Sequence, residues 1–600
     1  MKHINKSYTE LKSGYLFSKE ELNRKITIDA VYTQFDKTGR FAALDCDWRE
    51  GQENRPHIFW DSDVAKWIEG AAYSLAKHAD PELEAKIDVL TRKIKLNQQK
   101  DGYFNSYFTA VEPSKRFYNR HAHELYCAGH LIEAAIACDE IGKRELLECM
   151  EKYIEYIYRV FVKERSARFV TPGHEEIELA LLRLYRHNGN RLALELAAHF
   201  INVRGTDEDK QPDTPYVQRQ YDQSHLPVRE QKEAVGHAVR GLYLYTAMAM
   251  LAKETGDELL LDTCRALFKN ISERKMYVTG GVGSTCIGEA FTYDFDLPND
   301  TAYTETCAAI SLIYFCNAML ENENDARYAD VIERALYNGV LSGLSLDGKR
   351  FFYTNPLEIN LKEHFKQYGG ERQFPITQRP EIFSCSCCPP NLNRLLASLE
   401  GYVFGTDGGT VFINQYTAAD MNNGKVQCSV ATDYPVSGKI TVTANGAEKI
   451  ALRIPSWCGS FTLNKPYTVK NGYAVVANDG TPTELNLDIE PKAVFADSRV
   501  MRDNCRLCIM RGPVVYCAEA IDNEMDLHRY FVKPNFKYEL RQTVQNALPE
   551  LDVEAACIKE SGALYSSAPP QFEPSALHLI PYSTFANREE CDMRVWINRY

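Results

Sequence analysis

The chain of 600 residues is too long for one ordinary hydrophobic core, so we expect more than one domain. Hydrophobic residues make up 44% and charged residues 25% of the sequence, the balance of a globular protein, which excludes a disordered or fibrous one. The net charge of −13 is spread along the chain without a basic block, so nucleic acid and anionic membranes are excluded as expected partners.

Several features predict a soluble cytoplasmic protein. The N-terminal segment is polar and contains no apolar stretch of the kind that a secretion signal needs. No run of about 18 apolar residues occurs, and the nearest, residues 242–252, is too short to span a bilayer. The 18 cysteines are therefore interpreted as reduced thiols, most of them small buried apolar groups.

Residues 60–400 carry apolar residues at three- and four-residue spacing, which predicts helices joined by short loops. The predicted helices span residues 124–138, 175–185, 191–200, 233–253, 259–271, 305–321 and 326–341. This succession suits an all-helical bundle, solenoid or toroid, and the lack of a clear sequence repeat weakens the solenoid.

After about residue 405 the sequence changes to short β-branched and aromatic runs between turn signals, which predicts a β-rich half. The predicted strands span residues 411–416, 439–446, 450–454, 473–477, 483–489, 513–517 and 593–597. The spacing of these strands along the sequence is typical of a β-sandwich. Residues 522–574 are polar and irregular, and no element is predicted there.

Three cysteines, Cys385, Cys387 and Cys388, lie just before a proline pair. Adjacent cysteines do not readily form a disulfide with each other, so we interpret Cys387 and Cys388 as presenting two sulfurs to a metal. Upstream, Glu305 and Cys307 add a carboxylate and a thiol, which completes a four-ligand set suited to zinc. Purely structural zinc sites usually draw on Cys-x-x-Cys pairs, which these are not, and buried free thiols are the alternative.

Glu289 ends a glycine-rich loop, residues 280–289, whose glycines permit close backbone approach to a ligand. The loop lacks the lysine of a phosphate loop, and a lone glutamate is more often solvated or capping. Histidines in the helical half, together with Asp61, Asp63 and Trp67, predict the lining of a sugar-sized pocket. These histidines are His121, His123, His130, His174 and His237. Each alone is more often a structural hydrogen-bonding residue, and one of the two aspartates also suits a helix N-cap.

Five motifs together resemble glycoside hydrolase family 127, the β-L-arabinofuranosidases. They are DSDVAKW (61–67), HELYCAGH (123–130), GHEEIELAL (173–181), TETC (304–307) and CSCCPPN (385–391), and they occur in order within residues 30–420. The resemblance implies a multidomain α plus β protein, with an N-terminal (α/α)6 barrel (residues 1–405) followed by C-terminal β-sandwich, jelly-roll-like domains (residues 406–505 and 506–600). It also implies a retaining exo-hydrolase that acts on a small carbohydrate substrate, terminal β-L-arabinofuranose, and it is compatible with a homodimer.

Carried over by motif, the resemblance makes Glu305, Cys307, Cys387 and Cys388 the ligands of Zn²⁺, with Cys387 also the nucleophile and Glu289 the general acid/base. It further implies sugar contacts from His123, His174, His237, Glu333, Tyr353 and Gln34.

In such a mechanism a thiolate replaces the nucleophilic carboxylate of the usual retaining glycosidase, because a zinc-bound thiol is deprotonated at neutral pH. Glu289 would need a pKa raised toward the working pH to act first as an acid and then as a base. Two alternatives stay open: an inverting glycosidase with structural zinc, and a sugar isomerase or epimerase on a helical toroid. A non-catalytic carbohydrate-binding protein is a third reading, but it gives the thiol cluster no role.

Overall fold

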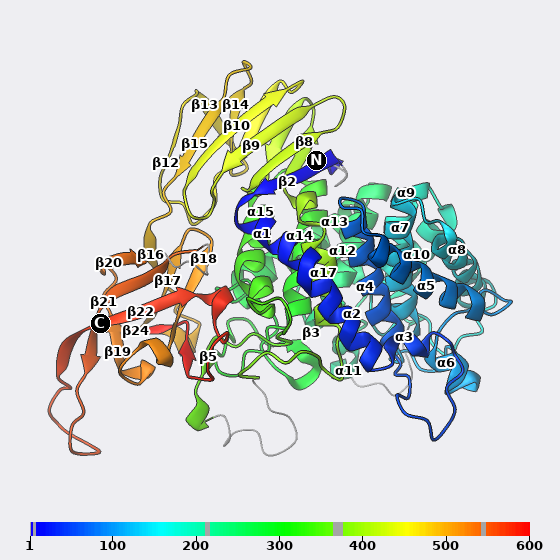
Figure 1. Cartoon of the computed structure of the whole chain (residues 1–600), viewed down its shortest axis with the longest axis horizontal. Helices are drawn as coiled ribbons and strands as arrows, with labels where there is room; N and C mark the ends of the chain where they lie inside the picture. The colour runs from blue at the N-terminus through cyan, green and yellow to red at the C-terminus, as the bar shows by residue number, and fades with distance from the viewer. Residues whose placement is uncertain (1, 4–7, 210–215, 364–375, 542–547) are drawn as a thin grey trace.

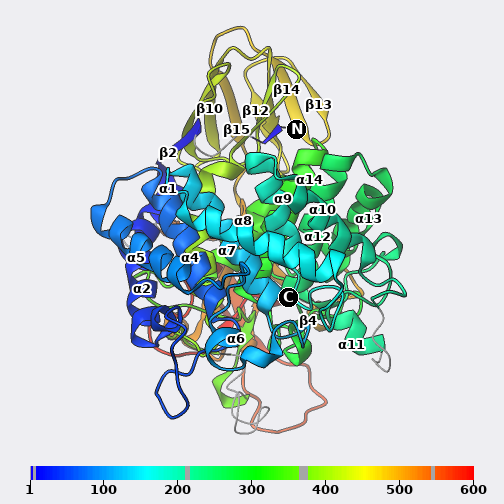
Figure 2. The same cartoon turned by 90° about the vertical axis from the view of Figure 1, so that its right-hand side faces the viewer.

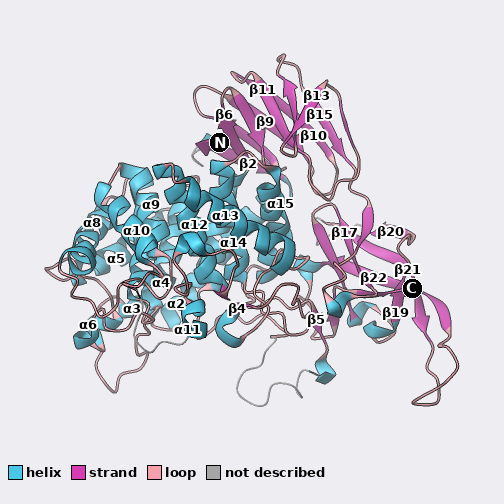
Figure 3. Cartoon of the chain, turned by 180° about the vertical axis from the view of Figure 1, so that it is seen from behind, coloured by secondary structure: helices cyan, strands magenta, loops and turns pink. Residues whose placement is uncertain are grey.

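The computed structural model describes residues 2–3, 8–209, 216–363, 376–541 and 548–600. A helical region comes first and β-rich regions follow it, which confirms the predicted order (Figure 1 and Figure 3). The α-helices are α1 (Gly14–Leu22), α2 (Ile28–Lys37), α3 (Arg40–Ala43), α4 (Trp60–Leu75), α5 (Pro81–Asn97), α6 (Tyr107–Ala110), α7 (Glu124–Glu140), α8 (Glu145–Tyr158), α9 (Ile177–Asn188), α10 (Arg191–Val203), α11 (Tyr216–Tyr221), α12 (Ala238–Thr255), α13 (Glu258–Asn270), α14 (Thr306–Asn322), α15 (Ala326–Arg334) and α17 (Cys388–Leu396).

The distribution of apolar residues determines which helices lie inside. Residues 124–138 of α7 and 238–252 of α12 are all buried, and α14 is buried around almost its whole circumference. The helices α8, α10 and α13 instead bury one face each. A helix that is apolar all round is stable only when enclosed, so α7, α12 and α14 form an inner layer that amphipathic helices cover.

Local capping chemistry sets the helix ends. Gly189 ends α9 with a φ of 75°, which favours glycine, and Asn190 then caps α10 by accepting the Ala193 N–H at 3.1 Å. Asp257 caps α13 in the same way, through the N–H of Leu260 at 2.9 Å. These caps separate consecutive helices by short turns, as the helical half of the sequence predicts.

Two six-stranded sheets form the first β region, which lies above the helices in Figure 2. One sheet has the order β1 (Lys2–His3), β6 (Phe404–Asp407), β7 (Thr410–Ile413), β11 (Lys449–Arg453), β14 (Tyr473–Ala477), β13 (Tyr467–Lys470). The other has the order β12 (Phe461–Leu463), β15 (Thr483–Leu487), β10 (Lys439–Asn445), β9 (Gln427–Thr432), β8 (Ala418–Asn422), β2 (Thr9–Ser13). Buried residues of both sheets, among them Val411, Ile450, Val442 and Leu485, belong to a hydrophobic cluster that continues into the helical region and the second β region.

The first strands of the chain belong to these sheets rather than to the helical region. Strand β1 pairs with β6 and β2 pairs with β8, so that Lys2 lies opposite Thr406 and Glu10 opposite Asp420. The segment 1–405, expected to be helical, therefore begins with two β-strands. Both are short and polar, so the sequence pattern gave no sign of them.

A ten-stranded sheet forms the second β region, near the C-terminus in Figure 1. Its strands are β5 (Glu358–Ile359), β16 (Pro491–Val494), β17 (Arg506–Arg511), β18 (Val514–Glu519), β19 (Tyr530–Val532), β20 (Tyr538–Arg541), β21 (Glu550–Ile558), β22 (Phe572–Pro581), β23 (Met593–Arg594) and β24 (Ile597–Arg599). Residues 522–574, where the sequence predicted no element, carry β19, β20, β21 and the start of β22. None of the helices in the described part of the chain is both long and apolar enough to cross a bilayer.

Candidate active site

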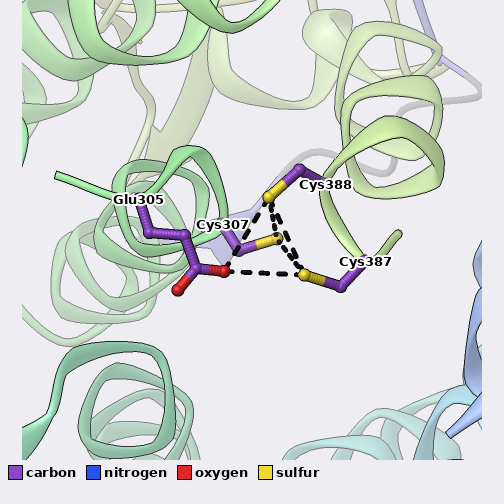
Figure 4. Close-up of side chains that lie close together, drawn as sticks. All are labelled: Glu305, Cys307, Cys387 and Cys388. Carbon is purple, nitrogen blue, oxygen red and sulfur yellow. Dashed lines mark hydrogen bonds between the residues drawn. The ribbon is translucent and has the colours of Figure 1, made fainter. Parts of the chain in front are cut away.

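Two helix starts bring the predicted metal ligands together (Figure 4). Glu305 directly precedes α14 and Cys307 lies in its first turn, whereas Cys387 directly precedes α17, which starts at Cys388. The Cys307 sulfur lies 3.6 Å from the Cys387 sulfur and 3.3 Å from the Cys388 sulfur. Glu305 Oε1 lies 3.6 Å from Cys387 Sγ and 3.8 Å from Cys388 Sγ. We call these four residues the thiol cluster.

Prolines and a buried ion pair fix the start of α17. The proline pair after Cys388 occupies the first turn, where backbone N–H groups have no helical partner, so the prolines cost no helical hydrogen bond. Arg394, further along the same helix, is 1% exposed and pairs with Glu69 at 2.9 Å and with Glu133 at 2.5 Å. These contacts anchor α17 to α4 and α7 and hold its two cysteines in place.

The separations within the thiol cluster fit a tetrahedral zinc centre. Zinc–sulfur bonds of about 2.3 Å in a tetrahedron place sulfurs about 3.8 Å apart, and the three sulfur–sulfur distances are 3.3, 3.6 and 3.7 Å. Glu305 Oε2 is buried and has no hydrogen-bond partner among the described residues. Three thiols and one carboxylate are donors that zinc accepts, so the residues present could hold this ion.

Glu289 lies beside the thiol cluster. One ligand atom each of Glu289, Glu305 and His237 lie within 4.8 Å of one another. Glu289 has a φ of 53° and follows Gly288, whose φ is 70°, so the backbone makes a left-handed turn here. The Glu289 side chain keeps 32% of its surface exposed. Its carboxylate is thus next to the cluster and still open to a substrate.

His237 sets the protonation state of Glu289. The Nδ1 of His237 accepts the backbone N–H groups of Val239 at 3.2 Å and Arg240 at 3.5 Å, at the start of α12, so the ring proton sits on Nε2. That nitrogen lies 2.8 Å from Glu289 Oε2 and donates to it. Burial is the largest influence on the pKa of Glu289 and raises it. The hydrogen bonds from His237 and Tyr303 and the electrostatic effect of His237 together outweigh burial, so the pKa is lowered. The hypothesis of a raised Glu289 pKa is therefore wrong for this arrangement.

Three of the predicted sugar-contacting histidines form a row. The ring centres of His123 and His174 lie 5.6 Å apart, as do those of His174 and His237, and the Tyr126 ring packs 4.1 Å from His174. Burial lowers the pKa of His123 to about 3 and holds the pKa values of His174 and His237 below the usual range. The row is therefore uncharged near neutral pH. His123 Nδ1 is buried and has no hydrogen-bond partner in the part of the chain that is described.

The other three predicted contact residues lie in different surroundings. The Tyr353 hydroxyl is 3.9 Å from the sulfur of Cys385, close to the thiol cluster. Gln34 donates a hydrogen bond of 2.8 Å to the exposed Glu381. Glu333, on α15, is 1% exposed, and its carboxylate is bonded to side chains of the first β region. The structure therefore brings Tyr353 to the site and places Glu333 at the junction between the helical region and the first β region. The sugar contacts of Tyr353, Gln34 and Glu333 stay predictions.

Two residues near the site escaped the sequence analysis. The Tyr303 hydroxyl hydrogen-bonds to Glu289. Lys66, fully buried on α4, donates to the Tyr126 hydroxyl at 3.1 Å and lies within electrostatic reach of Cys387. A lysine on a helix that is otherwise enclosed is rare without a partner, and this was the signal that could have found Lys66.

The acidic residues at the start of α4 are structural. The helix begins at Trp60, so Asp61 and Asp63 lie inside its first turn and neither is the N-cap. Asp61 accepts the Ser106 N–H at 2.8 Å, and Asp63 pairs with Arg40 at 3.0 Å. Both carboxylates are buried, and these contacts tie α4 to neighbouring segments.

A thiol cluster that could hold zinc, an adjacent carboxyl group and a row of uncharged histidines lie together and form the candidate site. A family model described as the β-L-arabinofuranosidase GH127 catalytic domain matches residues 10–401, and the C-terminal domain model of glycoside hydrolase family 127 matches residues 491–598. The chain belongs to glycoside hydrolase family 127 and is a hydrolase.

Similarity to individual relatives extends over almost the whole chain. A non-reducing end β-L-arabinofuranosidase from Bifidobacterium longum subsp. longum is 38% identical over 593 residues, 90% of this chain and 89% of the relative. The crystal structure of a GH127 β-L-arabinofuranosidase from Geobacillus stearothermophilus T6 is 38% identical, with a TM-score of 0.92 over 99% of this chain and 100% of the other. A further solved GH127 β-arabinofuranosidase is 30% identical, with a TM-score of 0.89 over 100% and 98% of the two chains.

Proposed function

We propose that the protein is an exo-acting β-L-arabinofuranosidase that releases terminal β-L-arabinofuranose from oligosaccharides or glycoconjugates. The named activity of relatives that match nearly the full length of the chain supports this substrate. One observation carries the mechanism: a thiol cluster containing Cys387 adjoins a carboxyl group, Glu289, that is partly exposed and hydrogen-bonded to a histidine.

We propose a retaining mechanism in two steps. The Cys387 sulfur attacks the anomeric carbon, the bond to the leaving oxygen breaks, and Glu289 gives that oxygen its proton. This step uses the protonated form of Glu289, which the lowered pKa of that carboxyl group makes scarce near neutral pH. Glu289 then takes a proton from water, whose oxygen attacks the same carbon and displaces Cys387 as a thiolate. Two inversions give net retention. Glu305, Cys307, Cys387 and Cys388 would hold Zn²⁺, which when bound keeps the thiols deprotonated at neutral pH.

The neutral histidine row suits the recognition of sugar hydroxyl groups. His123 and His174 offer ring nitrogens that donate or accept hydrogen bonds without the desolvation cost of a charge, whereas both ring nitrogens of His237 already have partners. His237 also orients Glu289, because its Nε2 proton is committed to that carboxylate. We propose that Tyr353, beside the thiol cluster, adds a further contact with the sugar.

We further propose that the helices form an (α/α)6 barrel and the two six-stranded sheets a β-sandwich. The expected domains at residues 1–405, 406–505 and 506–600 then need two changes, because β1 and β2 join the sandwich and β5 and β16 join the ten-stranded sheet. The inner and outer helix layers and the hydrophobic cluster that the two sheets share support this architecture. All 18 cysteines are unpaired, which supports a cytoplasmic location. Assembly into a homodimer stays a prediction.

Replacing Cys387 with serine tests the proposed function directly. A serine hydroxyl is a far weaker nucleophile than a thiolate, so we expect turnover of p-nitrophenyl β-L-arabinofuranoside to fall by more than about a thousandfold. Cys286→Ser, at an exposed cysteine in the loop that carries Glu289, is the matched control and should keep the wild-type rate. A near-normal rate in Cys387→Ser would contradict the thiolate role.

The stereochemistry of the product separates the retaining mechanism from the inverting alternative. Proton NMR of the first sugar released should show the β-anomer, because a covalent intermediate inverts the anomeric carbon twice. Release of the α-anomer would exclude a glycosyl-enzyme and would leave the metal a structural role.

A further inference from the structure

Lys66 is a buried cation to which the proposed mechanism gives no role. It lies within α4, its side chain is fully buried, and its ammonium group donates one hydrogen bond, to the Tyr126 hydroxyl at 3.1 Å. It has no ion-pair partner among the residues that the structure describes. A buried charge that meets only a neutral hydroxyl is costly, so a buried lysine usually faces an opposite charge.

The face of α4 that carries Lys66 runs alongside the segment that leads into α17. Asp63, Lys66 and Gly70 follow one another at helical spacing and therefore share this face. At the first end of the face, Arg40 pairs with Asp63 at 3.0 Å and donates to the Ser384 carbonyl at 3.1 Å. This arginine ties the beginning of α4 to the residues just before the cysteines of the thiol cluster.

The second end of the face touches α17 itself. A Cβ built on Gly70 would lie 2.9 Å from the backbone nitrogen of Arg394, so the backbones of the two helices approach closely there. Lys66 lies between these two ties on α4, and Cys387 and Cys388 lie between them on the other segment. The ammonium group of Lys66 therefore lies on the side of α4 that faces the start of α17.

The other charged side chains near Lys66 already have partners. Asp63 attracts Lys66 but is paired with an arginine of α3, and Arg394 is paired with two buried glutamates. Lys66 also interacts electrostatically with the sulfurs of Cys387 and Cys307, one from each half of the thiol cluster. The thiol cluster is therefore the opposite charge that this ammonium group faces.

The thiol cluster needs such a counter-charge when it holds a metal. Metal ligands are deprotonated, so three thiolates and one carboxylate bring four negative charges, of which Zn²⁺ cancels two. The cluster is largely buried, and an excess of negative charge is screened poorly there. A cation fixed in the same interior stabilises the loaded cluster, whereas an apolar side chain of the same length does not.

We propose that Lys66 is a positioning residue whose fixed positive charge stabilises both bound zinc in the thiol cluster and the thiolate form of Cys387. The proposal rests on the proposed function, because it takes the zinc ligands and the nucleophile from there. When Cys387 attacks the sugar its sulfur loses negative charge, and the sulfur regains that charge when water releases the sugar. The attraction to Lys66 therefore opposes the first step and favours the second.

Zinc retention tests the role of the charge without relying on turnover. Lys66→Met replaces the ammonium group with an apolar side chain of similar length, which suits a buried position. In competition with a coloured zinc chelator, starting from the zinc-loaded protein, we expect the Kd for zinc to rise at least about tenfold, because one nearby charge acts strongly in a poorly screened interior. Lys66→Arg keeps the charge and should keep the Kd within about threefold of the wild-type value.

Lys77→Met is the matched control. Lys77 lies just beyond the end of α4 and is paired with Glu20 and Glu400, far along the helix from the thiol cluster. Its replacement should lower the urea midpoint, because two ion pairs are broken, and should leave the Kd for zinc unchanged. The control separates a general loss of stability from an effect on the cluster.

Pre-steady-state kinetics with excess zinc provide the second measurement. Lys66→Met should slow the release of the sugar more than its attachment to Cys387. Mixing the variant with p-nitrophenyl β-L-arabinofuranoside should therefore give a burst of about one p-nitrophenol per chain, larger relative to the steady-state rate than the wild-type burst. A purely structural role of Lys66 would not change the balance between the two steps.

Three outcomes would contradict the proposal. A wild-type Kd for zinc in Lys66→Met, or equal losses of zinc in Lys66→Met and Lys66→Arg, would overturn the role of the charge at the cluster while the proposed function stands. An unchanged burst in Lys66→Met would overturn its effect on the Cys387 thiolate. Wild-type protein that holds no zinc and releases no arabinose would overturn the proposed function and the role of Lys66 together.

Discussion

Replacing Glu333 with glutamine should weaken the junction between the helical region and the first β region rather than the binding of substrate. Glu333 is 1% exposed and accepts hydrogen bonds from the Tyr434 hydroxyl at 2.6 Å, from Trp457 Nε1 at 2.9 Å and from both terminal nitrogens of Arg453. Breaking a buried ion pair costs about 3–5 kcal/mol. Because Arg453 keeps a second carboxylate, Asp330 at 2.6 Å, we expect the lower end of that range, about 3 kcal/mol.

Urea unfolding followed by tryptophan fluorescence measures this loss, since Trp457 itself lies in the junction. The KM for p-nitrophenyl β-L-arabinofuranoside, measured well below the unfolding transition, should stay within about twofold of the wild-type value. Asp330→Asn is the matched control, because it removes the other carboxylate of Arg453 at a residue without a proposed sugar contact. A Glu333→Gln variant that unfolds like the wild type and has a KM raised about tenfold or more would refute the structural role of Glu333. It would instead favour the predicted contact between Glu333 and the sugar.

Two further predictions concern the metal and pH. Cys388→Ser removes a sulfur of the thiol cluster that is not the proposed nucleophile. Elemental analysis of the purified variant should show a zinc content that falls from about one ion per chain toward zero. An unchanged zinc content would contradict the assignment of Cys388 as a ligand. The pKa of His123 is lowered to about 3 in the folded protein, against about 6.5 when unfolded. The unfolded chain therefore binds more protons, and stability falls as pH drops from about 6.5 toward 3. His123→Gln should make urea midpoints between about pH 7 and 5 less dependent on pH, and an unchanged slope would count against this.

Much of the helical region could be predicted because its helices are long and strongly periodic. The expected spans 124–138 and 233–253 correspond to α7 and α12, which are long and mostly apolar. The three- and four-residue pattern is clearest in α13, which buries one face and matches the expected span 259–271. The β-strands of residues 522–574 gave a weaker signal. In β21 every second residue from Leu551 to Cys557 is buried, yet alanine, cysteine and glutamate dilute the β-branched composition that marks a strand.

The site was predictable to the extent that its residues lie in short motifs. Glu305 and Cys307 flank the start of one helix and Cys387 and Cys388 the start of another, so each half of the thiol cluster could be read locally. Their meeting depends on long-range packing, so the sequence suggested the four-ligand set only through the match of donor types to zinc, which the family resemblance then supported. Lys66 could be noticed as a lysine on an otherwise enclosed helix, but its partner Tyr126 lies on another helix and could not be predicted.

The pairing of the first strands with β6 and β8 makes the whole helical region an insertion between strands of one β region. During synthesis on the ribosome, β2 emerges early, but its neighbour β8 appears only after all the α-helices in the described part of the chain have been made. The helices can form from local contacts during this time. The two six-stranded sheets can be completed only when strands that are far apart in the sequence have all been synthesised. Deleting residues 1–13 would therefore leave the outer strands β6 and β8 with bare edges that invite pairing with another chain.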